Sequence, residues 1–178
     1  MVQKTKKPRL FTDETWKLLI LLRKLEYLTN CGSGLVHKIH YCIVKYRFHV
    51  LSIKLGIDIG VNTFGPGLAM FHGGTTAVNG TARVGSNCQL YNGTNIALDC
   101  KIGNNVYIAP GAKILIGVTI ADNIRIGANA VVSKSFLEPN ITIAGIPAKK
   151  YQIKKAIICK APKSTKDYIR VKLHIRII

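Results

Sequence analysis

The chain has 178 residues, 48% of them hydrophobic, which is enough for one well-buried domain with extra structure at its ends. Its net charge of +18 is uneven, because residues 1–55 carry +8, residues 56–148 carry +1 and residues 149–178 carry +9. The structure and role of the nearly neutral middle segment must therefore be explained by features other than charge. Its basic ends lack a motif that reads nucleic acid, and no apolar run approaches the roughly 18 residues of a membrane-spanning helix.

The first segment, residues 1–55, predicts two helices. Thr12 is the expected N-cap, and Asp13 and Glu14 favour the positive end of the helix dipole. A first apolar series at helical spacing comprises Leu18, Leu21, Leu22, Leu25 and Leu28, and after a break at residues 30–34 a second comprises Leu35, Ile39, Cys42, Ile43, Tyr46 and Val50. We expect these helices to cap the following domain or pack on a partner subunit, while peripheral contact with a membrane surface is the alternative.

A six-residue repeat occupies the middle segment, residues 56–150. Ten consecutive aliphatic residues follow one another at intervals of six: Val78, Val84, Leu90, Ile96, Ile102, Ile108, Ile114, Ile120, Ile126 and Val132. Four positions after each comes a mostly small or β-branched residue, and Gly, Asn and Asp crowd the turns. A period of six does not fit a helix and indicates short strands separated by turns. The pattern predicts a mainly β solenoid, a parallel β-helix in which three hexapeptides form one coil.

The remaining residues, 151–178, read as a basic C-terminal tail. The alternation from Tyr168 to Ile178 would permit a strand there. The five cysteines contain no Cys-x-x-Cys pair, so we expect free thiols in a reducing, cytoplasmic location and no metal site. Cys88 and Cys100 fall in the column of small residues, where packing is the expected role.

Five stretches between about residues 17 and 150 resemble the serine acetyltransferase-like branch of the hexapeptide-repeat acyltransferases. They are LRKLEY at 22–27, KLGIDI at 54–59, NTFGPGL at 62–68 with HGG at 72–74, IGNNVYIAPGAK at 102–113 and AGIPA at 144–148. This branch includes enzymes that acetylate serine and others that acetylate sugars of surface polysaccharides. The resemblance implies a left-handed β-helix, acetyl-CoA as co-substrate and a homotrimer with active sites between adjacent subunits.

His72 is the candidate general base. The repeat slips there, because Met70 and Val78 are eight positions apart, so the two extra residues predict a bulge that brings an imidazole to the surface. An imidazole can take a proton from a hydroxyl that attacks a thioester carbonyl. The resemblance assigns Asp58 the orientation of this histidine, and it places the cofactor against Gly111, Ala112, Gly127 and Ala128, with Lys149 or Lys150 near its phosphates.

Two departures from the serine enzymes leave the acceptor open. The register runs uninterrupted from Leu90 to Ile108, where those enzymes carry a Gly-rich loop with an Arg-His pair, and Phe71 replaces an acidic residue before the histidine. Serine and a sugar hydroxyl therefore both remain candidates. A non-catalytic scaffold whose basic arms bind nucleic acid or an anionic membrane is the alternative to an enzyme, although the arms have little aromatic interleaving.

Overall fold

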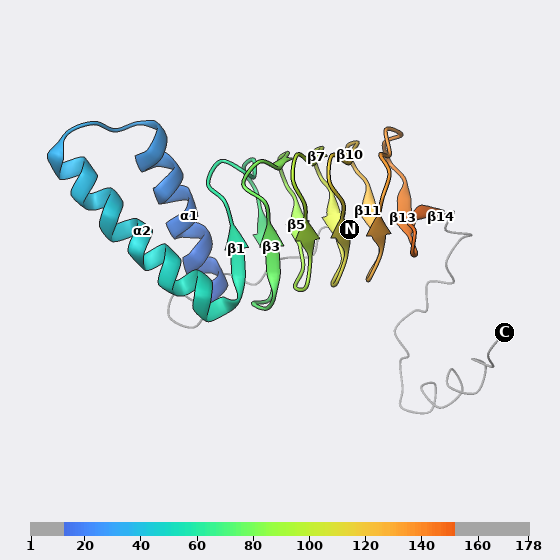
Figure 1. Cartoon of the computed structure of the whole chain (residues 1–178), viewed down its shortest axis with the longest axis horizontal. Helices are drawn as coiled ribbons and strands as arrows, with labels where there is room; N and C mark the ends of the chain where they lie inside the picture. The colour runs from blue at the N-terminus through green and yellow to red at the C-terminus, as the bar shows by residue number, and fades with distance from the viewer. Residues whose placement is uncertain (1–12, 152–178) are drawn as a thin grey trace, which may run out of the picture.

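A computed structural model of the chain describes residues 13–151, in which two helices precede a solenoid of short strands (Figure 1). The helices are α1 (Glu14–Asn30) and α2 (Leu35–Leu55). The strands are β1 (Ile57–Ile59), β2 (Ala69–Met70), β3 (Thr76–Val78), β4 (Arg83–Val84), β5 (Gln89–Leu90), β6 (Asn95–Ile96), β7 (Lys101–Ile102), β8 (Tyr107–Ile108), β9 (Lys113–Ile114), β10 (Thr119–Ile120), β11 (Arg125–Ile126), β12 (Val131–Val132), β13 (Thr142–Ala144) and β14 (Lys149–Tyr151).

The strands form three sheets that the chain visits in turn. Sheet A has the order β1-β3-β6-β9-β12, sheet B the order β4-β7-β10, and sheet C the order β2-β5-β8-β11-β13-β14. All pairings are parallel except the last, between β13 and β14. Each strand thus bonds to the equivalent strand one coil away, which confirms the predicted parallel β-helix of hexapeptide repeats with an N-terminal helical cap.

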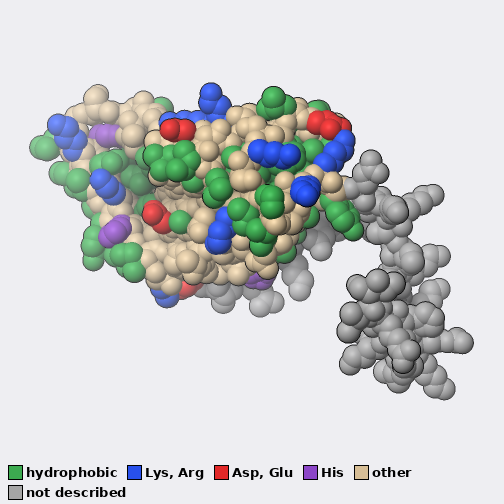
Figure 2. All heavy atoms as spheres, turned by 45° about the vertical axis from the view of Figure 1, so that its right-hand side comes forward, with side chains coloured by type: hydrophobic (Ala, Val, Ile, Leu, Met, Phe, Trp, Pro, Cys, Tyr) green, Lys and Arg blue, Asp and Glu red, His purple; other side chains and the backbone are tan. Residues whose placement is uncertain are grey.

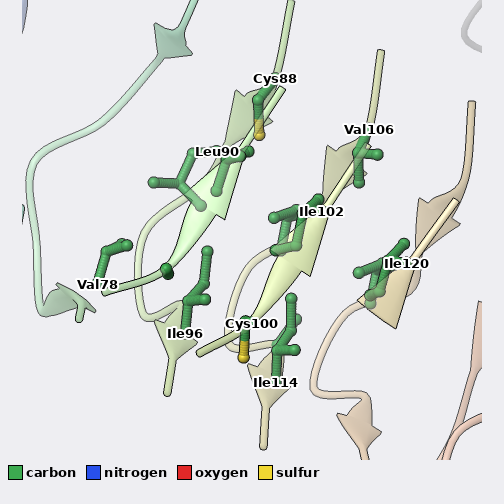
Figure 3. Close-up of a cluster of buried hydrophobic side chains, with 14 of the residues drawn as sticks. Val78, Cys88, Leu90, Ile96, Cys100, Ile102, Val106, Ile114 and Ile120 are labelled. Atoms are coloured by element: carbon green, nitrogen blue, oxygen red, sulfur yellow. The ribbon is translucent and has the colours of Figure 1, made fainter. Parts of the chain in front are cut away.

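The aliphatic column fills the interior of the coils. Leu90 pairs in register with Ile108, and Ile108 pairs with Ile126, so successive coils place an aliphatic residue at the same depth every eighteen residues. All three side chains have no exposed surface. Figure 3 shows Leu90, Ile102 and Ile120 of this column, together with Cys88 and Cys100, among the buried side chains of a shared core. Burial of this continuous apolar column is the main source of stability in such a stack.

Asparagines stabilise the turns that join sheet B to sheet C. Asn87, Asn105 and Asn123 all have positive φ angles of 55–58°, a conformation that Asn tolerates better than most residues. Their amides also form a ladder, since Asn87 donates to Asn105 at 3.1 Å and Asn105 donates to Asn123 at 3.0 Å. The turn residues expected at the corners are therefore found there.

Helix α1 covers the first coil. Its N-cap is Asp13, whose carboxylate accepts from the backbone N–H of Trp16 at 3.0 Å, so the prediction of Thr12 as N-cap is wrong by one residue. Leu18 and Leu22 enter the solenoid core. Arg23 donates to the carbonyl of Phe64, and the buried Glu26 accepts from the N–H of Asn62. The helix therefore satisfies backbone groups that the first coil would otherwise leave unpaired.

Helix α2 packs through a different face from the one that the apolar series predicts. Its buried residue is Val44, which contacts α1, and Phe48, Leu51 and Leu55 are partly buried against the core. The predicted series, in contrast, lies largely exposed: Leu35, Ile39, Cys42, Ile43, Tyr46 and Val50. This face does not pack on the solenoid, because the helix is apolar on two sides and the solenoid contacts the other one. The other option, packing on a partner subunit, stays a prediction.

The C-terminal end of the described structure is β14, which pairs with β13 and includes Tyr151, the first residue of the predicted tail. The rest of the tail, including the possible strand at 168–178, lies outside the described residues. Within residues 13–151, neither helix combines the length and apolarity needed to cross a bilayer.

The core column can be tested with Ile108→Ala, which removes a fully buried side chain at the centre of the stack. We expect the free energy of unfolding to fall by about 2–5 kcal/mol, because a cavity adds to the lost burial. Urea unfolding at fixed protein concentration measures this change. Leu137→Ala is the control, since Leu137 is 71% exposed and its truncation should cost less than about 0.5 kcal/mol. Equal losses in the two variants would contradict the packing described.

Candidate active site

The turn that carries His72 departs from the eighteen-residue register. Met70 pairs with Leu90, twenty residues later, whereas Leu90 pairs with Ile108 after eighteen, so the two extra residues lie between β2 and β3 as predicted. Gly74 has a φ of 136° and donates to the carbonyl of Leu55 at 2.8 Å. The turn is thereby held against the end of α2. His72 itself is exposed on the surface.

Asp58 lies on the outward face of β1, in register with Ala77 of β3. It lines a hollow of about 350 Å³ together with Asn95 and Lys113 of the following coils. The backbone of the His72 turn runs beside the residues that precede Asp58, because Thr76 donates to the carbonyl of Gly56 at 2.9 Å. Among the described contacts, however, the carboxylate and the imidazole form no hydrogen bond or ion pair with each other. The fold brings the two segments together without joining the side chains.

The predicted cofactor residues lie on the same edge of the solenoid as His72. The chain passes from sheet C to sheet A at residues 71–75, 91–94, 109–112 and 127–130, which we call the C–A edge. Gly111, with a φ of 74°, lies below Asn129, whose side-chain oxygen would be 2.1 Å from an added Cβ. Three coil steps of about 4.8 Å separate the first of these turns from the last, or about 14 Å.

The individual cofactor residues differ in what they can contact. Ala128 is exposed at the C–A edge, whereas Ala112 is fully buried and points into the core, so a contact between its side chain and a cofactor is excluded. Gly127 packs against Ala144, which pairs with Lys149 of β14. Lys149 therefore lies at the end of this edge and is exposed.

Of the two candidate lysines, Lys149 is the better placed for an anionic group. Lys150 forms an ion pair with Glu138 at 2.5 Å. That carboxylate already compensates its charge, which makes Lys150 less suited to phosphate.

An aromatic cluster beside His72 was missed by the sequence analysis. The rings of Phe71 and Tyr91 stack with centroids 5.1 Å apart, and those of Tyr91 and Tyr107 lie 5.2 Å apart at a tilt. Burial, followed by the neighbouring Tyr107, raises the pKa of Tyr91, so its hydroxyl remains a neutral donor. The sequence does contain a hint of this cluster. Each of the three aromatic residues is the direct sequence neighbour of a core residue, and those core residues, Met70, Leu90 and Ile108, pair with one another from coil to coil.

The buried cysteines have the predicted packing role. Cys88 and Cys100 have no exposed surface. Burial raises the pKa of the Cys88 thiol to about 12, and burial also raises that of Cys100, whose sulfur donates to the carbonyl of Leu115. Neutral, enclosed thiols are poor nucleophiles. Within residues 13–151, no group of three or more His, Cys, Asp or Glu residues is arranged to hold a metal ion.

A larger hollow than the one beside Asp58 lies elsewhere, between α1 and α2. It has a volume of about 960 Å³ and its lining includes Trp16, Leu19, Tyr27 and Val36. Neither His72 nor Asp58 lines it. The residues that could perform proton transfer lie on the solenoid, away from this hollow.

One known family of repeat sequences matches part of the solenoid. The family described as bacterial transferase hexapeptide (six repeats) matches residues 81–116 and 99–134. A comparison with curated protein sequences gave no match.

Solved structures extend the similarity to the helices. A serine acetyltransferase in complex with CoA superposes with a TM-score of 0.64 and 24% identity over 78% of this chain and 57% of its own. The Neisseria gonorrhoeae serine acetyltransferase in complex with serine gives a TM-score of 0.63 and 26% identity over 78% of this chain and 57% of its own. The soybean serine acetyltransferase complexed with serine gives a TM-score of 0.63 and 21% identity over 79% of this chain and 58% of its own.

The chain therefore contains hexapeptide repeats and shares its fold with these serine acetyltransferases, in accord with the resemblance of its motifs. It spans less than three fifths of the length of these serine acetyltransferases.

Proposed function

We propose that this protein is an acetyl-CoA-dependent O-acetyltransferase that transfers the acetyl group directly to a hydroxyl. The observation that carries the proposal is the bulge in the first coil, which presents His72 on the same edge as the turns at Gly111 and Ala128 and as Lys149. A serine acetyltransferase of the same fold has been solved with CoA, which supports the choice of co-substrate.

In the proposed reaction, the imidazole of His72 removes the proton from the acceptor hydroxyl as its oxygen attacks the thioester carbonyl. The tetrahedral intermediate then collapses, the carbon–sulfur bond breaks, and the imidazolium returns its proton to the departing thiolate. Asp58 would compensate the charge of the imidazolium and orient its ring once the substrates have closed the site. Small residues along the C–A edge would let the pantetheine arm lie close to the backbone, with Lys149 facing the phosphates.

We propose a sugar hydroxyl, rather than the hydroxyl of serine, as the acceptor. Phe71, rather than a carboxylate, precedes His72, so a charge partner for the ammonium group of serine is missing at that position. The cluster of Phe71, Tyr91 and Tyr107 instead provides apolar faces and two phenol hydroxyls. Such faces suit the C–H surface of a pyranose ring, while hydroxyls of the sugar can exchange hydrogen bonds with the phenols.

We also propose that the active unit is a homotrimer. The C–A edge is open in the single chain, so a neighbouring subunit would provide the opposite wall of the site. Exposed apolar side chains gather at the turns between sheets A and B, and they include Leu98, Leu115 and Ile116, the last 69% exposed. Leu115 also lines the hollow that holds Asp58, which would place a subunit contact next to the site.

His72→Ala should lower kcat for acetyl transfer by about 10²- to 10⁴-fold while leaving the affinity for acetyl-CoA unchanged, because a general base acts on the acceptor. Steady-state transfer and calorimetric titration of acetyl-CoA measure the two effects. Asp58→Asn should be milder, and the double variant little worse than His72→Ala, since the two residues act as a unit. The control His49→Ala alters an exposed histidine of α2 and should be neutral. A His72→Ala enzyme that keeps more than about a tenth of kcat would contradict the assignment.

Tyr91→Leu tests the acceptor. Loss of the ring should raise KM for the best oligosaccharide or nucleotide sugar about 2- to 10-fold, with KM for acetyl-CoA unchanged. The panel includes L-serine, for which wild-type kcat/KM should be lower than for the best sugar. If L-serine were the better substrate, the sugar proposal would fail while acetyl transfer would stand. Absence of transfer to every acceptor, with acetyl-CoA bound to no variant, would favour a non-catalytic scaffold.

Light scattering should report about three times the chain mass of 19.5 kDa. Ile116→Lys should shift the protein toward the monomer, because it places a charge at the proposed contact. Leu137→Lys, at an equally exposed position, is the control. A wild-type monomer with full transfer activity would show that no neighbouring subunit is needed.

A further inference from the structure

Helix α2 carries an apolar stripe that nothing in the described structure covers. The stripe consists of Ile39, Ile43, Tyr46, Val50 and Ile53, which are 48–70% exposed. They follow one another at alternating intervals of three and four residues, which places them along one side of a helix. At 1.5 Å per residue, the stripe is about 21 Å long.

This outward stripe faces away from the protein. The side of α2 that packs on α1 and the first coil carries Val44, Phe48 and Leu51, which lie roughly opposite the stripe on the helix. Figure 1 shows α2 as the outermost element at the helical end, beyond α1. A flat surface can therefore reach the full length of the stripe without meeting the solenoid.

Basic side chains border the stripe on both edges. Lys38 and Lys45 lie along one edge, Arg47 lies along the other, and all three are exposed. Lys54 continues the second edge and pairs with Glu14 at 2.6 Å. The helix sequence, residues 35–55, contains no Asp or Glu. Figure 2 shows hydrophobic, basic and histidine side chains next to one another at the helical end of the molecule.

We propose that α2 docks this protein on an anionic membrane surface, with the outward stripe in the boundary between headgroups and acyl chains. An apolar stripe bordered by Lys and Arg is the arrangement of interfacial helices, because the apolar side chains enter the acyl region while the basic heads remain among the phosphates. The helix lies in the plane of the interface and does not cross the bilayer, in accord with its composition. Docking would leave the C–A edge free to act on acceptors near the membrane.

Charge favours the lipid surface over a second copy of this helix. Two α2 helices joined along their stripes would bring Lys38, Lys45 and Arg47 of one copy against the basic residues of the other, with no carboxylate on either helix to pair with them. An anionic bilayer supplies the missing negative charge along both edges at once. The inference is independent of the proposed acetyl transfer, since its test reads binding only.

The experiment is flotation of the full chain with phosphatidylcholine vesicles that contain either no anionic lipid or about one third phosphatidylglycerol. We expect binding to the anionic vesicles that weakens as salt is raised. The triple variant Ile39→Ser, Ile43→Ser, Val50→Ser removes apolar surface but keeps every charge, and it should lose at least about tenfold in partitioning. The variant Lys38→Glu, Lys45→Glu, Arg47→Glu should lose about 100-fold or more.

A matched control replaces three exposed apolar residues of the solenoid, which lie outside the proposed subunit contact, by Ser: Leu137, Ile146 and Tyr151. It should bind vesicles like wild type, and circular dichroism establishes that all variants are folded. Equal binding by the stripe variant and wild type would overturn the proposal, because the basic arms alone would then explain adsorption. A second result would also overturn the proposal: the wild-type protein does not bind vesicles, and the stripe variant has a lower oligomeric mass than wild type. The stripe would then be a surface for self-association.

Discussion

The structure depends on one geometric constraint, the return of the chain to the same position after eighteen residues. This return lets the backbone N–H groups of one coil donate to carbonyls of the next coil, as the N–H of Gln89 does to Val106 at 2.9 Å. It also stacks each aliphatic side chain on the aliphatic side chain of the preceding coil. Hydrogen bonding and apolar burial thus require the same register. The consequence for function is that a departure from the register must appear on the surface, and the largest departure before the final coil presents His72.

The repeat made the solenoid predictable, because a period of six specifies which side chains enter the core and which residues form turns. Leu90 and Ile108 are as buried as their positions in the repeat require. The helices were harder. Helix α2 carries apolar residues on two sides, so periodicity identified a helix but could not decide which side meets the solenoid; Val44 and Phe48, rather than Ile39 and Ile43, make that contact.

The site was predictable in part for the same reason. The register slip singled out His72, and the resemblance gave Gly111, Ala112 and Ala128. Small size at a corner does not distinguish inward from outward positions, so the sequence could not show that the Ala112 side chain is buried and leaves only its backbone groups for a co-substrate. The stack of Phe71 on Tyr91 was not visible because those residues are twenty positions apart and meet only when the bulge sets the first coil. Asp58 was identified through the resemblance. In the described structure its carboxylate forms no hydrogen bond or ion pair with the imidazole of His72.

The described structure combines a solenoid that has one long open edge with two helices that close one of its ends and present a surface of their own. The central claim, that this edge is the catalytic surface, is tested most directly by a crystal structure with bound CoA. We predict the phosphates beside Lys149, the pantetheine arm along the turns at Ala128 and Gly111, and the sulfur directed toward His72. CoA bound between α1 and α2, or anywhere that leaves its sulfur remote from His72, would contradict the account.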